Sequence, residues 1–330
     1  MPESLLNFPL IGARAVHFAS TISLAGIVIF LLFVGEPALR LSSNREAPGA
    51  AAFRGRLSRI ACFSLAISVL SGAAWLWLLA ADITGSSLIR VISDGTVATL
   101  LTRTRFGHDW EARLVMAGFL AAALTRFRRE TGWSLPQAVF ATSLAVLFLG
   151  SLVWSGHGGA TPGVRGDVHI AADMLHLVSA GAWVGGLLPL ALFFSAALRT
   201  PGEDWAIIAC DATMRFSTLG VASVGTLVIT GLFNTWVLVG TIPRLLGTLY
   251  GRLLLLKVAT FLVMLALAAF NRMYLTPRLV EANQRGQRRG VEALRQLRRH
   301  SLIEMGLGLA VLVLVGALGS ISPMQGMDSW

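Results

Sequence analysis

Five of the six histidines in this chain of 330 residues are expected on the same side of a membrane. They are His17, His108, His157, His169 and His176. A neutral imidazole is a good ligand for copper, zinc, iron and nickel. Histidines gathered on one face of so apolar a chain therefore predict a metal or redox-cofactor site.

Three of the side chains with metal-site chemistry follow a helical spacing. His169, Asp173 and His176 stand at positions i, i+4 and i+7, so one face of a helix presents an imidazole, a carboxylate and a second imidazole. The two imidazoles can ligate a metal, and the carboxylate can accept a hydrogen bond from one ring and so orient it. This column predicts the centre of the site.

Other candidate ligands come from segments beside this helix. His157 lies in the glycine-rich stretch Ser155-Gly156-His157-Gly158-Gly159, which can fold over the start of the helix. Near the C-terminus, Met324 and Met327 provide two thioethers, and thioethers select Cu(I) over harder ions. These residues predict that the site is completed by flexible chain on the same side of the membrane.

The composition indicates that the chain spans a membrane several times. Hydrophobic residues make up 55% of the chain and charged residues only 13%, whereas the apolar share of soluble domains is about 45–50%. The sequence predicts an all-α integral membrane protein with eight transmembrane helices, because eight apolar runs approach the roughly 20 residues that cross a bilayer. They cover about 12–34, 57–81, 110–126, 134–154, 169–198, 213–240, 249–274 and 301–321. The first run is interpreted as a helix and not as a signal peptide, because Arg14 interrupts it and it lacks a basic leader.

The basic residues are concentrated in particular loops between the apolar runs. A net charge of +10 is typical of nucleic-acid binders, but here the arginines gather between the first and second, third and fourth, and seventh and eighth runs. The positive-inside rule makes these loops cytoplasmic, which leaves both termini and the five histidines on the periplasmic side. We therefore expect the chain to contact the lipid bilayer and no nucleic acid.

The second half of the sequence repeats the first. A shift of 159 positions carries His17 onto His176, Gly26 onto Gly185, Gly72 onto Gly231 and Trp77 onto Trp236. After the second helix of each half the shift is 144, which aligns Arg113 with Lys257. The repeat predicts two four-helix units, residues 1–156 and 157–330, which share one orientation and are related by an axis along the membrane normal.

The repeat also aligns residues that differ. Arg14 aligns with Asp173, three residues before the histidine of each helix, so the two charges either pair across the axis or both reach the outer interface. His108 aligns with Arg252 and is the weakest candidate of the five histidines. Arg14, Asp173 and His108 are therefore expected to support the ligands and not to bind the metal themselves.

At this point the residues resemble the CopD/PcoD family of copper resistance proteins in bacterial inner membranes. The matching stretches are His169-x6-His176 with Ala182-Trp183-Val184-Gly185-Gly186-Leu187, Arg215-Phe216-Ser217, Thr230-Gly231, Trp236, Tyr250-Gly251 with Lys257, Asn271-Arg272, Thr276-Pro277-Arg278, Leu297-Arg298-Arg299 with Glu304, and Thr104-x-Phe106-Gly107-x-x-Trp110-x-x-Arg113. The resemblance spans nearly the whole chain. We expect Trp183, within one of these stretches, to lie beside the ligands.

The resemblance implies an eight-helix protein of the cytoplasmic membrane that moves copper inward. Proteins of this family often cooperate with a periplasmic copper carrier of the CopC type. The chain contains no CopC-like domain, so such a carrier is expected to be a separate protein. On this reading the chain is a transporter or copper-binding membrane protein and not an enzyme.

The leading hypothesis is that the periplasmic face binds copper, which then passes between the two halves. Its ligands are His17, His157, His169 and His176, helped by Met324 and Met327. No continuous line of Met, Cys or His crosses the bilayer, which also favours two alternatives. One is a membrane oxidoreductase, with haem b between His17 and His176 or with a copper centre acting on quinol or oxygen. The other is an assembly factor that delivers copper to another membrane enzyme.

Overall fold

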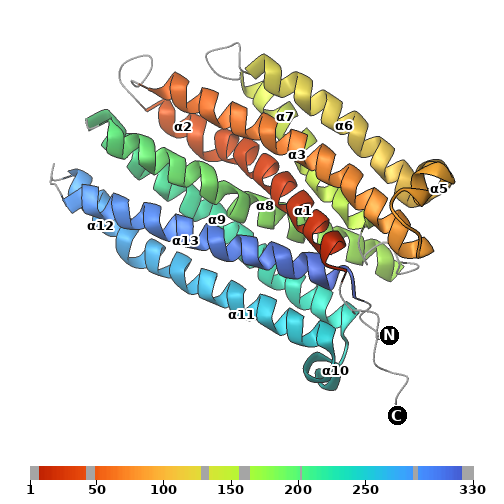
Figure 1. Ribbon diagram of the computed structural model, residues 1–330. Coiled ribbons are helices and arrows are strands. Elements are labelled where there is room, and N and C mark those ends of the chain that lie inside the picture. Colours follow the sequence, from red (N-terminus) through yellow and green to blue (C-terminus); the bar gives the residue numbers. More distant parts are fainter. Residues whose placement is uncertain are drawn as a thin grey trace.

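The computed structural model describes residues 7–41, 49–127, 134–155, 164–200, 203–284 and 289–321, and within these ranges it contains helices and no strand. The long helices lie side by side along one direction and form an elongated bundle (Figure 1). In chain order the elements are α1 Phe8–Phe30, the π-helical turn η1 Leu31–Gly35, α2 Glu36–Leu39, α3 Ala50–Thr84, α4 Arg90–Ser93, α5 Thr96–Arg103, α6 Arg105–Phe127, α7 Leu135–Gly150, the 3-10 turn η2 Ser151–Ser155, α8 Val164–Arg199, α9 Glu203–Leu238, α10 Ile242–Gly247, α11 Leu249–Phe270, the π-helical turn η4 Asn271–Leu275, α12 Thr276–Gln284 and α13 Arg289–Leu318.

Seven helical segments among the described residues are long and apolar enough to cross a membrane. They are Phe8–Leu39, Ala50–Thr84, Leu135–Ser155, Gly166–Arg199, Trp205–Leu238, Leu249–Asn283 and Gly290–Leu318. The prediction of an all-helical membrane protein is thereby confirmed. The remaining predicted run, 110–126, lies within α6, which is 23 residues long but carries charges such as Asp109, Glu111 and Arg113 and is not among the seven.

Two helices form the centre of the bundle. α1 packs against α3, α7, α8 and α13, and α8 also packs against α9 and α13. The two central helices cross at Gly26 and Gly185, where a Cβ added to Gly26 would lie 2.2 Å from the carbonyl carbon of Gly185. Only glycine permits so close a crossing, because nonbonded carbon atoms pack at about 3.5–4.0 Å.

The other long helices are divided between the two central ones. α3, α6 and α7 gather around α1, whereas α9, α11 and α13 gather around α8 (Figure 1). The boundary predicted after residue 156 falls between η2 and α8. Each central helix is therefore surrounded mainly by neighbours from its own half of the sequence.

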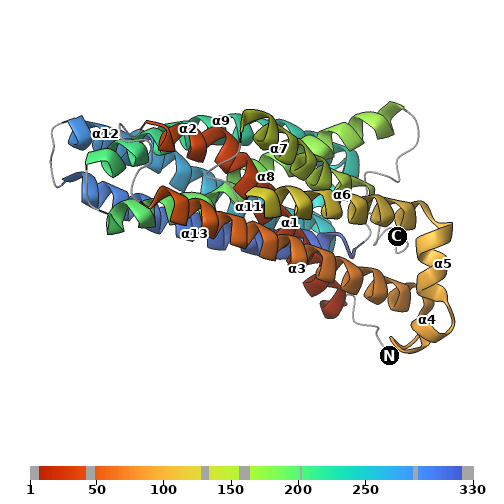
Figure 2. The ribbon, with the colours of Figure 1, turned by 90° about the horizontal axis from the view of Figure 1, so that it is seen from above.

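The two ends of the bundle differ in charge. We call the end where α1 begins and α13 ends the terminal end; α4, α5 and α10 also lie there (Figures 1 and 2). The opposite end, the arginine end, is formed by α2, α12, the ends of α6 and α8 and the starts of α3, α7, α9 and α13. Its arginines include Arg54, Arg126, Arg199, Arg278, Arg295, Arg298 and Arg299.

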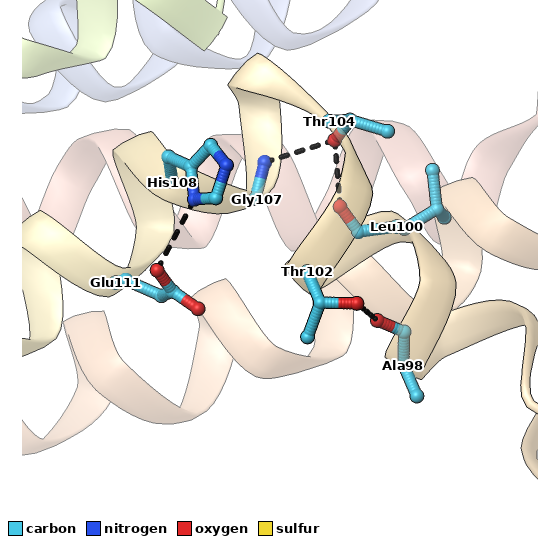
Figure 3. Close-up of polar contacts among 7 residues, drawn as sticks. All are labelled: Ala98, Leu100, Thr102, Thr104, Gly107, His108 and Glu111. Atoms are coloured by element: carbon cyan, nitrogen blue, oxygen red, sulfur yellow. Dashed lines mark hydrogen bonds and ion pairs between the residues drawn. The ribbon is translucent and has the colours of Figure 1, made fainter.

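Two corners at the terminal end share one capping geometry. At the start of α6, the Thr104 hydroxyl donates to the Leu100 carbonyl at 2.6 Å and accepts from the Gly107 amide at 3.0 Å (Figure 3). At the start of α11, Thr248 makes the same contacts with the Arg244 carbonyl and the Gly251 amide, at 2.8 and 3.0 Å. In both corners a Cβ on the glycine would collide with a carbonyl oxygen of the preceding short helix, Leu101 or Leu245 respectively.

Candidate functional site

His17 on α1 is engaged through both of its ring nitrogens. It is 1% exposed, and the rings of Trp75 and Trp110 pack against it with centroids 5.6 and 5.2 Å away. Nδ1 lies 2.9 Å from the carbonyl oxygen of Ser68, which only accepts hydrogen bonds, so Nδ1 carries the proton. Nε2 then accepts a hydrogen bond from Nη2 of Arg113, 3.0 Å away. This ring therefore has no free nitrogen for a metal ion.

Arg113 on α6 links His17 to α7 and to the turn that follows it. Its guanidinium also donates to the carbonyl of Phe148 at 2.7 Å and to the hydroxyl of Ser151 at 2.5 Å. It lies over the aromatic rings of Phe148 and Trp110, at 4.4 and 5.4 Å from their centroids. The surroundings of His17 are thus a packed hydrogen-bond network with α6 and α7.

His176 on α8 is engaged through one ring nitrogen only. Its Nδ1 lies 2.9 Å from the hydroxyl oxygen of Thr230, and that hydroxyl donates its own proton to the carbonyl of Thr226 at 2.6 Å. The Thr230 oxygen must therefore accept from His176, which puts the ring proton on Nδ1 and a lone pair on Nε2. Among the described residues Nε2 has no hydrogen-bond partner. An imidazole fixed in this way is arranged as metal ligands are.

A cavity of about 200 Å³ lies beside His176, and we call it the His176 cavity. His169, Asp173 and His176, which stand at i, i+4 and i+7 on α8, all line it. α9 and α11 contribute further polar residues to its wall: Asn234, Thr235, Tyr250 and Lys257. His169 is 1% exposed, and its ring lies edge-on to Phe233 with centroids 6.5 Å apart.

The residues that the predicted repeat aligns differ in size around His17 and His176. The position of Trp75 corresponds to Asn234, and that of Trp110 corresponds to Leu254, so two large rings are replaced by smaller side chains that line the cavity. Arg113 corresponds to Lys257. Lysine lacks the forked guanidinium with which Arg113 reaches His17 and Phe148 at once.

The polar groups of the His176 cavity are only partly satisfied by one another. Nδ2 of Asn234 donates to Asp173 at 3.2 Å, and the charge of Lys257 interacts with both Asp173 and His176. Within the described ranges, Oδ1 of Asn234 and Oγ of Ser155 are buried without a hydrogen-bond partner. Buried polar atoms are normally bonded, so these two oxygens indicate room for a polar or ionic ligand.

Arg14 has a different partner from the one predicted. It lines the His176 cavity with Asp173, but its guanidinium donates to the carbonyl of Gly319 and, at 3.3 Å, to the hydroxyl of Ser320. It also lies 4.8 Å from the centroid of the Trp75 ring. Among the described residues, then, Arg14 is bonded to the end of α13, and the predicted ion pair with Asp173 is not formed.

The remaining predicted residues lie away from this cavity or outside the described ranges. His108 is on the exposed side of α6, with Nδ1 3.3 Å from Oε2 of Glu111 (Figure 3). Trp183 is buried deeper in the bundle, edge-on to Phe261 with centroids 5.9 Å apart. The predicted ligands His157, Met324 and Met327 lie outside the described residues.

Three residues of the site were not assigned to it from the sequence. Thr230 holds Nδ1 of His176, Asn234 donates to Asp173, and Lys257 supplies a cation to the same space. The repeat contains a signal for two of them, because Thr230 aligns with Ser71, which contacts His17, and Lys257 aligns with Arg113. Polar residues that face the same histidine in both halves are candidates for the site.

Two family models match the chain. Residues 2–167 match the model described as Copper resistance protein D-like, N-terminal domain, and residues 211–318 match the model described as Copper resistance protein D. The chain is similar to Copper resistance protein D of Pseudomonas syringae pv. tomato, with 30% identity over 322 residues, 95% of this chain and 96% of the relative. No solved structure matches the chain.

Two further relatives have related descriptions. Inner membrane protein YebZ of Escherichia coli (strain K12) is 27% identical over 320 residues, 97% of this chain and 100% of the relative. Copper transport protein CutJ of Bacillus subtilis (strain 168) is 28% identical over 230 residues, 69% of this chain and 39% of the relative. With both halves matched and one relative covered almost from end to end, this multi-pass membrane protein belongs to the copper resistance protein D family.

Proposed function

We propose that the chain binds copper in the His176 cavity, with the imidazoles of His176 and His169 as its protein ligands. One observation carries the proposal: Nε2 of His176 has a lone pair and no partner among the described residues, while Thr230 fixes the opposite nitrogen. Imidazole suits copper, and a hydrogen bond to the second nitrogen orients the ring and raises its basicity. Asp173 offsets the positive charge that a copper ion adds beside Lys257.

Further ligands are proposed from chain that adjoins the cavity. Gly319 lines it, and Met324 is five residues further along, a stretch that spans up to about 17 Å when extended. Met327 is eight residues beyond Gly319, and His157 is two residues beyond Ser155, which also lines the cavity. Their thioethers and imidazole are ligands that suit copper.

We also propose that the His176 cavity faces the periplasm. The arginine end then lies in the cytoplasm, as the positive-inside rule favours, and both chain termini are periplasmic. In this arrangement α6 is the eighth span, since it is 23 residues long and packs between α3 and α7. Its buried Arg113 is compensated by three hydrogen-bond acceptors.

The two-repeat organisation is part of the same proposal. Three pairs of aligned features support it: the glycines at the crossing of α1 and α8, the threonine caps of α6 and α11, and the hydroxyls that contact Nδ1 of His17 and His176. These pairs lie in the order that the repeat predicts. In this scheme one repeat has kept an open site and the other has closed it.

Copper bound in this cavity is proposed to move inward to the cytoplasm. One relative is described as a copper transport protein and another as a copper resistance protein, which supports copper as the cargo. The donor on the periplasmic side is proposed to be a separate CopC-like carrier. Haem b is not favoured, because both nitrogens of His17 are engaged and the two tryptophans cover its ring.

The experiment that tests the proposal is a titration of the purified protein with Cu(I) against a chromophoric chelator. We expect His176→Ala to remove the tight site, and His108→Ala to keep it, because His108 is exposed on α6 and its contact is with Glu111. Equal copper affinity and stoichiometry in the wild type and His176→Ala would refute the assignment. Loss of binding in His108→Ala alone would place the site at the α5–α6 corner.

A further inference from the structure

The arginine end contains a second and larger cavity. It has a volume of about 390 Å³ and lies between α8, α9, α13 and the end of α11, where η4 begins. Most of its wall is apolar and includes Trp183, Leu187 and Phe216. One acidic side chain, Glu304 of α13, also lines it, and we call this space the Glu304 cavity.

Glu304 is held by a short chain of hydrogen bonds. It is 2% exposed, and its Oε1 accepts from Nδ2 of Asn271 at 2.8 Å. Oδ1 of the same asparagine accepts from Nδ1 of His300, 2.6 Å away. Asn271 begins the π-helical turn η4, and the hydroxyl of Thr276 donates to its carbonyl at 3.0 Å. Turns of this kind inside long helices frequently mark functional sites.

A second buried glutamate provides the contrast. Glu36 at the same end is 7% exposed, and Arg54 contacts both of its carboxylate oxygens, at 2.7 and 3.0 Å. The bidentate arginine thus places an opposite charge directly against this buried carboxylate. Among the described residues no arginine, lysine or histidine forms an ion pair with Glu304. A buried charge without a counter-ion costs several kcal/mol, and protonation removes that cost.

The charged groups near Glu304 do not supply such a counter-ion. The guanidinium of Arg272, on η4, lines the cavity but donates to the hydroxyl of Ser217 at 2.6 Å. His300, on α13 itself, is bonded to Asn271. The residues that α8, α9, α11 and α12 contribute to the wall are uncharged, and α1 contributes none.

We propose that Glu304 is a proton-binding site reached from the arginine end of the membrane. The carboxylate takes up one proton on Oε2, since Oε1 accepts from Asn271, and becomes a neutral carboxyl; release of the same proton restores the carboxylate. Asn271 holds the carboxyl group in place, and His300 fixes the orientation of the asparagine amide. Arg272 is exposed and lines the cavity, so protons reach Glu304 from solvent on the side of Arg272. This site does not depend on copper binding at the other end of the bundle.

The experiment is infrared difference spectroscopy of the purified protein in lipid, recorded between acidic and alkaline pH in H₂O and D₂O. We expect a carbonyl-stretch band of a protonated carboxyl that shifts in D₂O. This band is lost in Glu304→Gln and kept in Glu36→Gln. A band that survives in Glu304→Gln, or no such band in the wild type, would overturn the proposal.

A second variant keeps the proposal testable if Glu304→Gln fails to fold. Asn271→Leu leaves the carboxyl in place but removes the N–H that stabilises its ionised form. The midpoint of the same band is therefore expected at higher pH than in the wild type. An unchanged midpoint would show that the titrating group is not Glu304, whether or not the protein binds copper.

Discussion

The substitution Thr230→Val tests how the site is built without touching a proposed ligand. Valine has nearly the shape of threonine but offers no oxygen to Nδ1 of His176, which now lies 2.9 Å from the hydroxyl. Loss of such a partner behind a metal ligand typically lowers metal affinity about 10- to 100-fold. At about 1.4 kcal/mol per factor of ten, this corresponds to a loss of about 1.4–2.8 kcal/mol in binding free energy.

The chain provides a matched control in the same helix. The hydroxyl of Thr213 is equally buried and bonds to the carbonyl of Ala209 at 2.7 Å, but it does not contact His176. Thr213→Val and Thr230→Val each lose one hydrogen bond to the preceding turn, but only Thr230→Val also leaves Nδ1 of His176 without its acceptor, so a somewhat lower melting temperature is expected for Thr230→Val. Cu(I) affinity, measured by chelator competition, is expected to fall only in Thr230→Val. Equal affinities in the two variants would refute the role assigned to Thr230.

Two other predictions concern the closed half and the helix crossing. Gly26→Ala forces α1 away from Gly185 and is expected to lower stability by about 1–3 kcal/mol, seen as a lower melting temperature in detergent. Gly12→Ala, in the same helix with no atom within 4 Å of the added Cβ, is the control, and an equal effect of both would contradict the crossing. Arg113→Leu leaves Nε2 of His17 without a donor, and a loss of at least about 1–3 kcal/mol is expected. An unchanged melting temperature in that variant would show that the hydrogen bond is not formed.

Most of what could be predicted about the His176 cavity came from the helical spacing of its residues in the sequence. The spacing of His169, Asp173 and His176 depends only on helix geometry, and all three line one cavity. The apolar runs likewise predicted a helical membrane protein, because the lengths and compositions needed to cross a bilayer are visible in sequence. The run at 110–126 is not among the seven apolar segments, since charges such as Asp109, Glu111 and the buried Arg113 lower the hydropathy of α6.

The hydrogen-bond partners of the two histidines and of Arg14 could not be predicted from the sequence pattern, because they depend on contacts between distant residues. His17 and His176 occupy aligned positions, but Arg113, 96 residues from His17, occupies the free nitrogen of one and not of the other. One of the two expectations for Arg14 was an ion pair with Asp173, yet Arg14 bonds to a backbone carbonyl 305 residues away. Backbone acceptors exist at every position and leave no mark in a sequence pattern, so such a partner becomes visible only in three dimensions.

A structure of the copper-loaded protein tests the central claim most directly. We expect copper in the His176 cavity, bonded to Nε2 of His176, with Nδ1 still hydrogen-bonded to Thr230 and with His17 still bonded to Ser68 and Arg113. Copper bonded to His17 with Arg113 displaced, or copper bound away from the His176 cavity altogether, would contradict it.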